Sequence, residues 1–348
     1  MSDIKNIALT SFNPGSGCGC KIPPSKLKEV IDSSDYDPNQ SFQKLIIGHD
    51  QNDDAAVMDL GDGQALVHST DFFTPIVDDP FEFGSIAASN AISDIYAMGA
   101  SPEMALAILG WPIDKLGPEM AGRVLAGARD VCKRAGLPLA GGHSIDIPQP
   151  IFGLSVTGRV NIKNLKRNEG AKPGDLLYLT KPIGIGIVAT AMKKNIANED
   201  DIKWGLSIMK RLNNEGIQLG GIDGVHAMTD ITGFGLGGHL HEMMKASNCS
   251  SEIDFNAIPT YDRDRLKNLY SQQCMPTGTT KNYLAYHEDI SKVSGEELFI
   301  LFDPQTSGGL LVSADPKCKS EIENTLKKYG PINCIGTVIE KNEKLINL

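Results

Sequence analysis

The chain has 348 residues, of which 41% are hydrophobic and 22% charged, and its formal net charge is −10 at pH 7. This length favours two domains over one, and the composition is typical of a globular protein rather than a disordered one. The negative charge, with no block of Lys and Arg, argues against nucleic-acid binding and implies that an anionic ligand needs metal ions as counter-charge.

The N-terminus lacks the positive-then-apolar pattern of a signal peptide, and no apolar run is long enough to span a bilayer. The seven cysteines are an odd number scattered through a long chain, which is typical of a reducing compartment. We therefore predict a cytoplasmic protein that does not associate with membranes.

The run at 17–21 combines Cys18, Cys20 and Lys21 with two glycines. A cation beside a thiolate favours the ionised sulfur, which would make Cys18 a nucleophile at neutral pH. The preceding residues 13–16 cannot hold a regular element, so this segment is expected to move as a flap. Half of a metal site and an incidental surface thiol fit the spacing equally well, although no other cysteine pair completes a zinc site.

Residues 1–44 are predicted to form an N-terminal segment that holds the flap and a short helix near 25–31. Two strands joined by Gly61-Asp62-Gly63 are expected to form a hairpin. A helix begins at Asp78-Asp79-Pro80 and ends at Gly99. Residues 45–165 are thus predicted to form an α/β layer domain, with strands at 55–60, 65–70, 104–109, 137–140 and 152–160 and helices at 80–98 and 118–135.

The polar, turn-rich stretch 164–170 marks the predicted domain boundary, and a second α/β domain is expected over residues 166–348. Its strands are predicted at 176–180, 225–228, 298–302 and 310–313, and its helices near 185–194, 201–218, 235–247 and 317–329. The predicted fold class is therefore α/β (α+β) with two domains.

Aspartates recur at the ends of apolar strands and on a helix rich in small residues. Asp53 and Asp54 precede one strand, and Asp71 ends another. Asp230 follows a third strand, and Asp94 lies on the helix at 80–98. Each of them alone is more typical of a helix cap or a turn. Carboxylates that converge from strand ends need a cation, and hard oxygen ligands suit Mg²⁺.

Two further features could belong to the same site. Asn90 and Asp94 lie four residues apart and share a helix face with small residues, which suits either a ligand or tight packing. The glycine-rich run at 141–144, which includes His143, is predicted as a loop whose backbone N–H groups could bind phosphate. A plain tight turn between strands is the alternative for this run.

The segment 233–238 matches the G-x-G-x-x-G pattern of a dinucleotide-binding loop. Asp230 just before it would repel a pyrophosphate, so we interpret the glycines as a turn that presents Asp230. His239 and His241 cannot share a helix face and are interpreted as ordinary polar residues. The run at 303–309 is predicted as a strand-to-strand turn, and no P-loop or G-x-S-x-G elbow occurs.

Seven motifs follow one another from the flap nearly to the C-terminus: GCGCK at 17–21, DDAAV at 53–57, TDFF at 70–73, NAISDIYAMG at 90–99, AGGHSID at 140–146, MTDITGFG at 228–235 and the turn at 303–309. Together they resemble the selenophosphate synthetase (selenide, water dikinase) family. The resemblance implies an aminoimidazole ribotide synthetase-like fold and a homodimer built on the N-terminal domain. It also implies conversion of ATP, selenide and water to selenophosphate, AMP and phosphate, with Mg²⁺ required.

The resemblance also implies roles for single residues. Cys18 matches the cysteine or selenocysteine position and is expected to deliver or orient selenium. Lys21 matches the essential lysine and is expected to neutralise phosphate or the incoming anion when the flap closes over ATP. The metal ligands match Asp54, Asp94 and Asp230. The nucleotide contacts match Lys21, Gln51, Asn52, Asp53, Asp71 and Asp94, with Gly142, His143 and Ser144 reaching the nucleotide of the partner subunit.

One departure concerns Gln51-Asn52, where some members of the family carry Thr-Arg; a possible cation near phosphate is therefore missing. The resemblance leaves open whether a monovalent cation takes part.

Two other functions remain open from the sequence. A synthetase or kinase of the same fold, acting on an amide, a ribotide or thiamine phosphate, would use the aspartates equally well but does not need the Cys18 flap. A non-enzymatic redox or metal-carrier protein would use Cys18 and Cys20, but it leaves the aspartates without a role.

Overall fold

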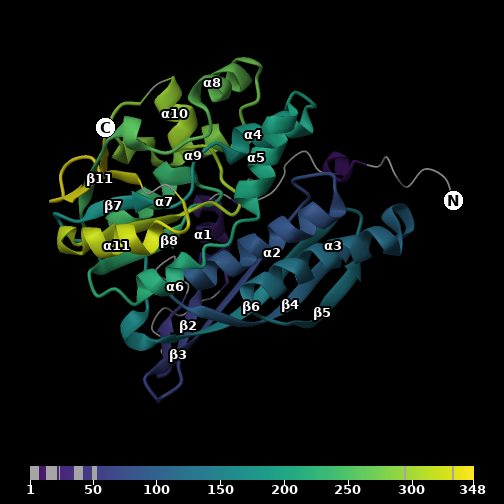
Figure 1. Cartoon of the computed structure of the whole chain (residues 1–348), viewed down its shortest axis with the longest axis horizontal. Coiled ribbons are helices and arrows are strands. Elements are labelled where there is room, and N and C mark those ends of the chain that lie inside the picture. The colour runs from purple at the N-terminus through teal and green to yellow at the C-terminus, as the bar shows by residue number, and fades with distance from the viewer. Residues whose placement is uncertain are drawn as a thin grey trace.

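The computed structural model describes residues 8–12, 22, 24–34, 42–48, 53–293, 295–330 and 333–348. Within them the chain forms two six-stranded sheets, one from each half of the sequence, with helices packed on both (Figure 1). The predicted α/β class and two-part architecture are confirmed. The predicted flap around Cys18 lies outside the described residues. The domain boundaries stay a prediction.

The first sheet has the strand order β1-β2-β3-β6-β4-β5, and every neighbouring pair is antiparallel except β4 and β5. The hairpin predicted around Gly61 is confirmed as β2 and β3. The strands are β1 (Leu45–Ile47), β2 (Ala56–Asp59), β3 (Gln64–Phe73), β4 (Ser101–Trp111), β5 (Leu139–Asp146) and β6 (Ile151–Asn161). The helices of this half are α1 (Pro24–Asp32), α2 (Pro80–Ala97) and α3 (Ile113–Ala135).

Helices α2 and α3 lie side by side along one face of this sheet (Figure 1). The side chain of Asp79 accepts a hydrogen bond from the Glu82 N–H, which caps α2 as the sequence predicts. The two helices approach closely because glycines stand at their contact. A Cβ on Gly127 would lie 2.0 Å from the Phe81 carbonyl oxygen, which only a glycine avoids.

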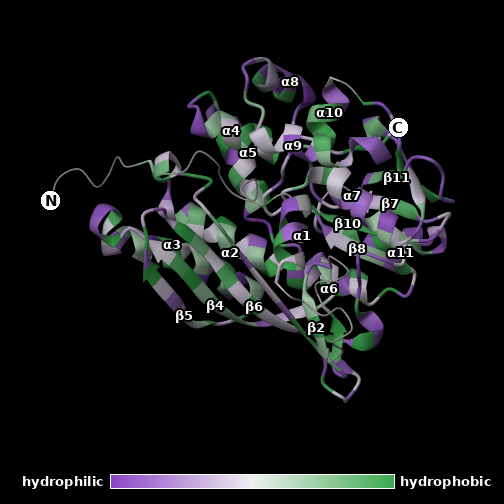
Figure 2. Cartoon of the chain, turned by 180° about the vertical axis from the view of Figure 1, so that it is seen from behind, coloured by the Kyte–Doolittle hydropathy of each residue, from purple (hydrophilic) through white to green (hydrophobic). Residues whose placement is uncertain are grey.

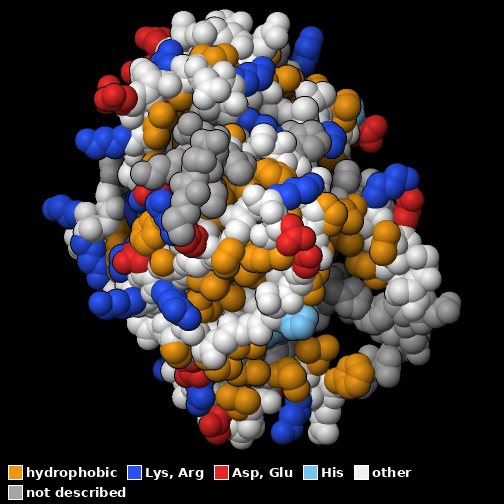
Figure 3. All heavy atoms as spheres, turned by 90° about the vertical axis from the view of Figure 1, so that its right-hand side faces the viewer, with side chains coloured by type: hydrophobic (Ala, Val, Ile, Leu, Met, Phe, Trp, Pro, Cys, Tyr) orange, Lys and Arg blue, Asp and Glu red, His pale blue; other side chains and the backbone are white. Residues whose placement is uncertain are grey.

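The opposite face of the first sheet, called the open face because no helix of the described residues is packed along it, carries large apolar side chains. Strands β4 and β6 contain many hydrophobic residues (Figure 2). Alternation along the strands turns half of them away from the helices. Viewed from the side where β5 lies, hydrophobic side chains are exposed over the lower half of the molecule (Figure 3). Five of the large side chains on the open face are between 39% and 50% exposed, namely Met58, Phe72, Met104, Leu106 and Ile145.

The second sheet has the order β12-β9-β11-β7-β10-β8. Its strands are β7 (Leu176–Leu179), β8 (Val225–Asp230), β9 (Ser250–Ile253), β10 (Leu310–Ala314), β11 (Asn333–Ile339) and β12 (Ile346–Asn347). The helices of this half are α4 (Ile185–Lys193), α5 (Glu199–Met209), α6 (Glu215–Gly220), α7 (Gly235–Ala246), α8 (Arg263–Ser271), α9 (Thr277–Tyr286), α10 (Glu296–Leu301) and α11 (Lys319–Leu326). Short 3₁₀ turns occur at Leu9–Phe12, Ile162–Asn164, Phe255–Ala257, His287–Asp289 and Pro316–Cys318.

Two predicted elements of the second half are wrong. The segment 298–302 belongs to helix α10 and not to a strand, because a short apolar run fits a buried helix as well as a buried strand. The helix predicted over 201–218 is two helices, α5 and α6, separated at residues 210–214. There Arg211 leaves the helical path, and its guanidinium donates to the Thr180 carbonyl at 2.7 Å. Sequence patterns also missed the short strands β1, β9, β11 and β12.

The segment between the sheets, predicted as a polar linker, is packed rather than loose. Lys166 and Asn168 are buried, and the Lys166 ammonium donates to the Val225 carbonyl at 2.8 Å. No helix in the described part of the chain combines the length and the apolar character needed to cross a membrane.

We predict that Gly127→Ala destabilises the protein by about 1–3 kcal/mol, since the added methyl group collides with the α2 backbone and forces α2 and α3 apart. The matched control is Gly122→Ala in the same helix, because a Cβ there has nothing within 4 Å. That substitution should stabilise the protein by up to about 1 kcal/mol, by improving helix propensity. Chemical denaturation of both variants tests this, and equal effects of the two would contradict it.

Candidate active site

Helix α2 lies between the two sheets and carries polar side chains that face both. It packs on β3 and β6 of the first sheet, and on β8, α5 and α6 of the second half. Asn90 and Ser93 are fully buried on this helix. Buried polar groups need hydrogen-bond partners. The partners of α2 therefore come from strands and loops of both halves, and they include the predicted aspartates.

One pair of aspartates links α2 to the first sheet. Ser69 and Asp71 lie two residues apart in β3 and share the face that meets the helix. The Asn90 amide nitrogen donates to the Asp71 carboxylate, and the Ser69 hydroxyl donates to the Asp94 carboxylate. The predicted pairing of Asn90 and Asp94 on one helix face therefore serves an ordered polar site, with the sheet supplying the complementary groups.

A second pair of aspartates links the halves. The Thr229 hydroxyl, in β8, donates to Asp54 Oδ1 at 2.9 Å. The Ser93 hydroxyl, on α2, donates to Asp230 Oδ2 at 2.5 Å. Asp230 is only 2% exposed, although it stands at the end of its strand. Asp54, from the first half, and Asp230, from the second, are thus held beside each other by short side chains.

Burial dominates the electrostatics of this group. Burial, followed by the neighbouring charges of Asp230 and Asp94, raises the pKa of Asp54 well above its usual range. Asp54 Oδ2 is buried and has no hydrogen-bond partner. A buried carboxylate oxygen without a donor is costly, and so is the proximity of like charges. Both costs disappear when a cation occupies the space that these carboxylates face.

The donor set fits Mg²⁺ held together with a ligand rather than by a complete protein cage. Among the residues that the structure describes, no three His, Cys, Asp or Glu side chains could hold a metal ion by themselves. Mg²⁺ commonly binds one or two carboxylates and takes its remaining ligands from water and substrate phosphates. Asp54, with its unpartnered oxygen, Asp94 and Asp230 would hold such an ion together with a ligand, and their assignment as metal ligands stays a prediction.

Asp53 faces away from this group and joins the packed segment after the first sheet. Its carboxylate accepts the Asn168 N–H at 2.8 Å and the Arg167 guanidinium at 3.3 Å. Burial nevertheless raises the pKa of Asp53, against the lowering effect of these two partners. The structure therefore gives Asp53 a role in joining the two halves, and its predicted nucleotide contact stays a prediction.

Gly142, His143 and Ser144 lie in strand β5, so the predicted loop is wrong. Gly142 has a φ of +149°, and a Cβ there would lie 2.1 Å from the Ala107 carbonyl oxygen; glycine permits the pairing with β4. Asp71 pairs with Leu154 in β6, Leu154 pairs with Ala107 in β4, and Ala107 pairs with Gly142. Asp71 and Gly142 are therefore three strand spacings, or about 14 Å, apart. Within one chain, this run and the aspartates do not meet.

The glycines at 233–238 form a turn after β8 and the first turn of α7, as the predicted turn beside Asp230 requires. A Cβ on Gly237 would lie 2.8 Å from the Phe302 ring, so this glycine permits the packing of α7. His239 Nε2 accepts the Thr232 N–H at 3.1 Å, and His241 pairs with Asp289 at 2.8 Å. Both histidines are buried and partnered inside the second half, which agrees with their interpretation as structural residues.

Several site residues escaped the sequence analysis. Ser69, Ser93 and Thr229 adjoin predicted aspartates by one or two residues, and that proximity was the available signal. Asn213 had no such signal, and Ser307 was marked only as part of the motif at 303–309. The Asn213 amide donates to the Ser93 hydroxyl at 2.8 Å, and the Ser307 N–H donates to Asn90 Oδ1 at 2.8 Å.

Ser307 belongs to the run at 303–309, which connects helix α10 to strand β10 and is not the predicted strand-to-strand turn. Of the other predicted residues, Cys18, Lys21, Gln51 and Asn52 lie outside the described part of the chain.

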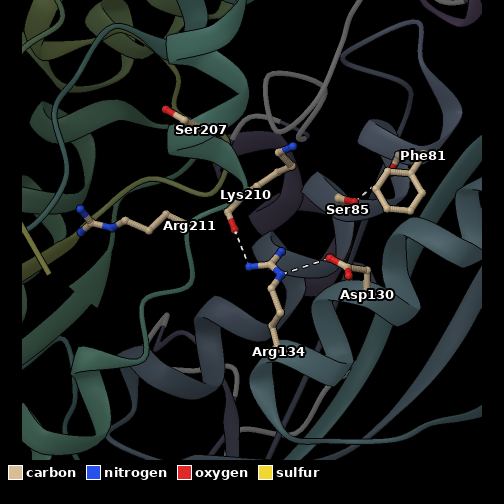
Figure 4. Close-up of a pocket in the computed structure, with 7 residues that line it drawn as sticks. All are labelled: Phe81, Ser85, Asp130, Arg134, Ser207, Lys210 and Arg211. Atoms are coloured by element: carbon tan, nitrogen blue, oxygen red, sulfur yellow. Dashed lines mark hydrogen bonds and ion pairs between the residues drawn. The ribbon is translucent and has the colours of Figure 1, made fainter.

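A separate cavity of about 350 Å³ lies between α2, α3 and the end of α5 (Figure 4). Arg134 crosses it and donates to the Asp130 carboxylate at 3.2 Å and to the Lys210 carbonyl at 3.3 Å. None of the predicted site residues lines it, so it is distinct from the aspartate group. Its lining residues are Phe81, Ser85, Asp130, Arg134, Ser207, Lys210 and Arg211.

Known proteins resemble this chain over nearly its full length. Residues 52–160 match the family described as AIR synthase related protein, N-terminal domain, and residues 172–346 match the corresponding C-terminal domain. A solved thiamine-monophosphate kinase from Stenotrophomonas maltophilia K279a has a similar fold, with a TM-score of 0.64 and 15% identity. That similarity covers 94% of this chain and 96% of the kinase.

Two relatives are much closer in sequence. A protein of Aeromonas hydrophila named selenide, water dikinase is 50% identical over 319 residues, which cover 92% of this chain and 91% of that protein. A protein of Colwellia psychrerythraea with the same name is 47% identical over 346 residues, 99% of both chains. On the strength of both domain matches and of this identity, the chain belongs to the selenide, water dikinase family.

Proposed function

We propose that this chain synthesises selenophosphate from ATP, selenide and water, and releases AMP and phosphate. The observation that carries the proposal is the near-complete alignment with selenide, water dikinases at 47–50% identity. The aspartate group supports it independently. The chain has a net charge of −10 and no block of Lys and Arg for a polyphosphate, and a cation beside its buried carboxylates would supply positive charge.

Asp54, Asp94 and Asp230 are proposed to hold Mg²⁺ against the ATP phosphates. When bound, Mg²⁺ neutralises phosphate charge in the ground state and in the transition state. The protein's own part is to keep the carboxylates fixed. Ser69, Ser93 and Thr229 donate to them, so that the carboxylates need not reorganise when a nucleotide binds. Asp53, Asp71, Gln51 and Asn52 stay proposed nucleotide contacts.

The remaining chemistry is assigned to the segment at 17–21. Cys18 is proposed to deliver or orient selenium, and Lys21 to neutralise phosphate or the incoming selenide anion. Both anhydride bonds of ATP are split in the overall reaction, so the site must admit selenide before water. A flap that closes over the first step would keep water out.

A homodimer is proposed on the open face of the first sheet. A contiguous apolar surface of this kind typically marks an interaction site. The register places His143 beside Ile108 on that face, in line with Gly153 and Phe72. A second copy packed there would be close to Gly142, His143 and Ser144, which lie too far from the aspartates of their own chain. A cytoplasmic location stays a prediction.

The two alternative functions have less support. The thiamine-monophosphate kinase shares the fold at only 15% identity, which carries no information about substrate. A redox or metal carrier leaves the buried aspartates unexplained.

We predict that the purified protein, incubated anaerobically with ATP, Mg²⁺ and selenide, produces a new selenide-dependent signal in phosphorus NMR, together with AMP and phosphate. Cys18→Ser should abolish this signal if the thiol handles selenium. A synthetase or kinase acting on another substrate would be unaffected by that change. ADP as the only nucleotide product, or turnover that does not depend on selenide, would refute the proposed function.

Asp54→Asn should abolish binding of Mg²⁺ with nucleotide without lowering the unfolding temperature of the unliganded protein. Loss of the buried charge relieves repulsion from Asp230 and Asp94, so the unliganded variant should unfold at a temperature equal to or above that of the wild type. The thermal shift caused by Mg²⁺ with a non-hydrolysable ATP analogue should disappear. The control Asp62→Asn, in an exposed turn where Asp62 caps the Gln64 N–H, should leave that shift intact. An undiminished shift in Asp54→Asn would remove Asp54 from the metal site.

Leu106→Lys should weaken the dimer at least tenfold, because it places a charge in the centre of the apolar face. Leu284→Lys, which changes a side chain that is 61% exposed on α9, is the control and should not affect assembly. Sedimentation equilibrium of both variants gives the answer. A wild-type protein that stays monomeric at micromolar concentration would contradict the assignment of this face.

A further inference from the structure

Lys181, two residues after the end of strand β7, is a fully buried lysine to which the proposed function assigns no role. Its side chain is 0% exposed. Its ammonium nitrogen donates to two backbone carbonyls, Arg211 at 2.7 Å and Ser307 at 2.7 Å. Burying a lysine is costly unless its donors are satisfied by well-placed acceptors. Here both acceptors are main-chain atoms, so the lysine joins two segments of backbone that are far apart in sequence.

The two segments are the loops that border the aspartate group. One is the break between α5 and α6, which contains Asn213 as well as Arg211. The Asn213 amide donates to the Ser93 hydroxyl and to the Gly308 carbonyl, each at 2.8 Å. Ser93 in turn donates to Asp230. The first carbonyl held by Lys181 is therefore two residues from the side chain that fixes the partner of Asp230.

The other segment is the run at 303–309, which packs against α2 beside the aspartate group. Ser307 has a φ of +51°, a backbone conformation that a serine adopts only when its surroundings enforce it. Its N–H donates to Asn90 Oδ1, and Asn90 donates to Asp71. The second carbonyl held by Lys181 is therefore on the residue whose N–H orients Asn90 toward Asp71.

The link through Lys181 does not require the lysine to be charged. Burial, and then the Arg211 cation, lowers the pKa of Lys181 to about 7, while the carboxylates of Glu215 and Asp230 act in the opposite direction. An ammonium carries three N–H donors and a neutral amine two. Both forms can serve the two carbonyls, so the link does not depend on the charge of the lysine.

We infer that Lys181 is a positioning residue for the metal–nucleotide site: by joining the Arg211 and Ser307 carbonyls, it fixes the two loops that orient Ser93 and Asn90 toward Asp230 and Asp71. This inference rests on the proposed function and names a residue that acts on the site without touching the nucleotide. Loosened loops would let Asp230 turn away from the cation and Asp71 turn away from the nucleotide, and misplacement of a bound group by about 1 Å is enough to cost a large factor in rate.

The test compares Lys181→Met with Lys166→Met. Methionine keeps most of the apolar stem and removes every donor. Lys166 is a matched control, because it is also buried and donates to two backbone carbonyls, Val225 at 2.8 Å and Ile222 at 3.4 Å. Its acceptors lie before and at the start of β8, the end of that strand opposite to Asp230. Both variants should unfold at lower temperature than the wild type, by similar amounts.

Calorimetric titration with Mg²⁺ and a non-hydrolysable ATP analogue separates the two positions. We expect at least a tenfold loss of affinity in Lys181→Met and less than a twofold change in Lys166→Met. Lys181→Gln, whose amide keeps two donors on a shorter stem, should recover part of the affinity. It also carries the test if the methionine variant does not fold.

Two outcomes would overturn the inference. One is wild-type affinity in Lys181→Met, or in Lys181→Gln if that variant carries the test. The other is an equal loss of affinity in Lys166→Met. If the wild-type protein itself fails to bind Mg²⁺ and the ATP analogue, the proposed function is wrong, and that result is distinct from either outcome because it appears before any substitution is made.

Discussion

The burial of helix α2 between two sheets is the constraint on which the rest of this structure depends. A helix covered on all sides cannot leave its polar side chains to water, and α2 carries Asn90, Ser93 and Asp94 in its buried middle turns. Each of these side chains must find a partner outside the helix. They find Asp71 and Ser69 in the first sheet and Asp230 in the second half. The hydrogen bonds that the buried polar side chains of α2 require therefore also set the relative position of the two halves.

The same constraint concentrates negative charge. Asp54, Asp94 and Asp230 approach one another where little water is available, so their mutual repulsion is weakly screened, and the pKa of Asp54 rises. A protein that only needed stability would carry apolar residues at such positions. The arrangement is consistent with a site that is completed by a cation and a phosphate chain, whose opposite charges cancel much of the cost. Stability of the empty protein is thereby exchanged for a preorganised ligand shell.

Sequence patterns predicted the first half better than the second. Strands β3, β4 and β6 and helices α2 and α3 are long, and their periodicity or caps are unambiguous, as at Asp79 and Pro80. The second half contains short elements such as β9, β12 and α10, where two to six residues carry too little periodicity to separate a strand from a helix. The glycine-rich run at 141–144 was interpreted as a loop, because glycine is typical of turns. Only the close approach of β4 explains it as strand.

The sequence by itself determined the chemical types at the site and the family: the aspartates at strand ends, the Cys18–Lys21 run and seven ordered motifs identified the selenide, water dikinase family before any fold was known. Each motif is a run of neighbouring residues, so the sequence alone shows both the chemical side chains and the residues that flank them. Only the tertiary structure decided which groups hold the aspartates. Ser307 acts through its main-chain N–H and carbonyl, Lys181 donates to two main-chain carbonyls, and Asn213 acts through its side-chain amide. Their partners lie tens to hundreds of positions away, so no sequence pattern pairs them, although Ser307 lies in the motif at 303–309; folding alone brings them together.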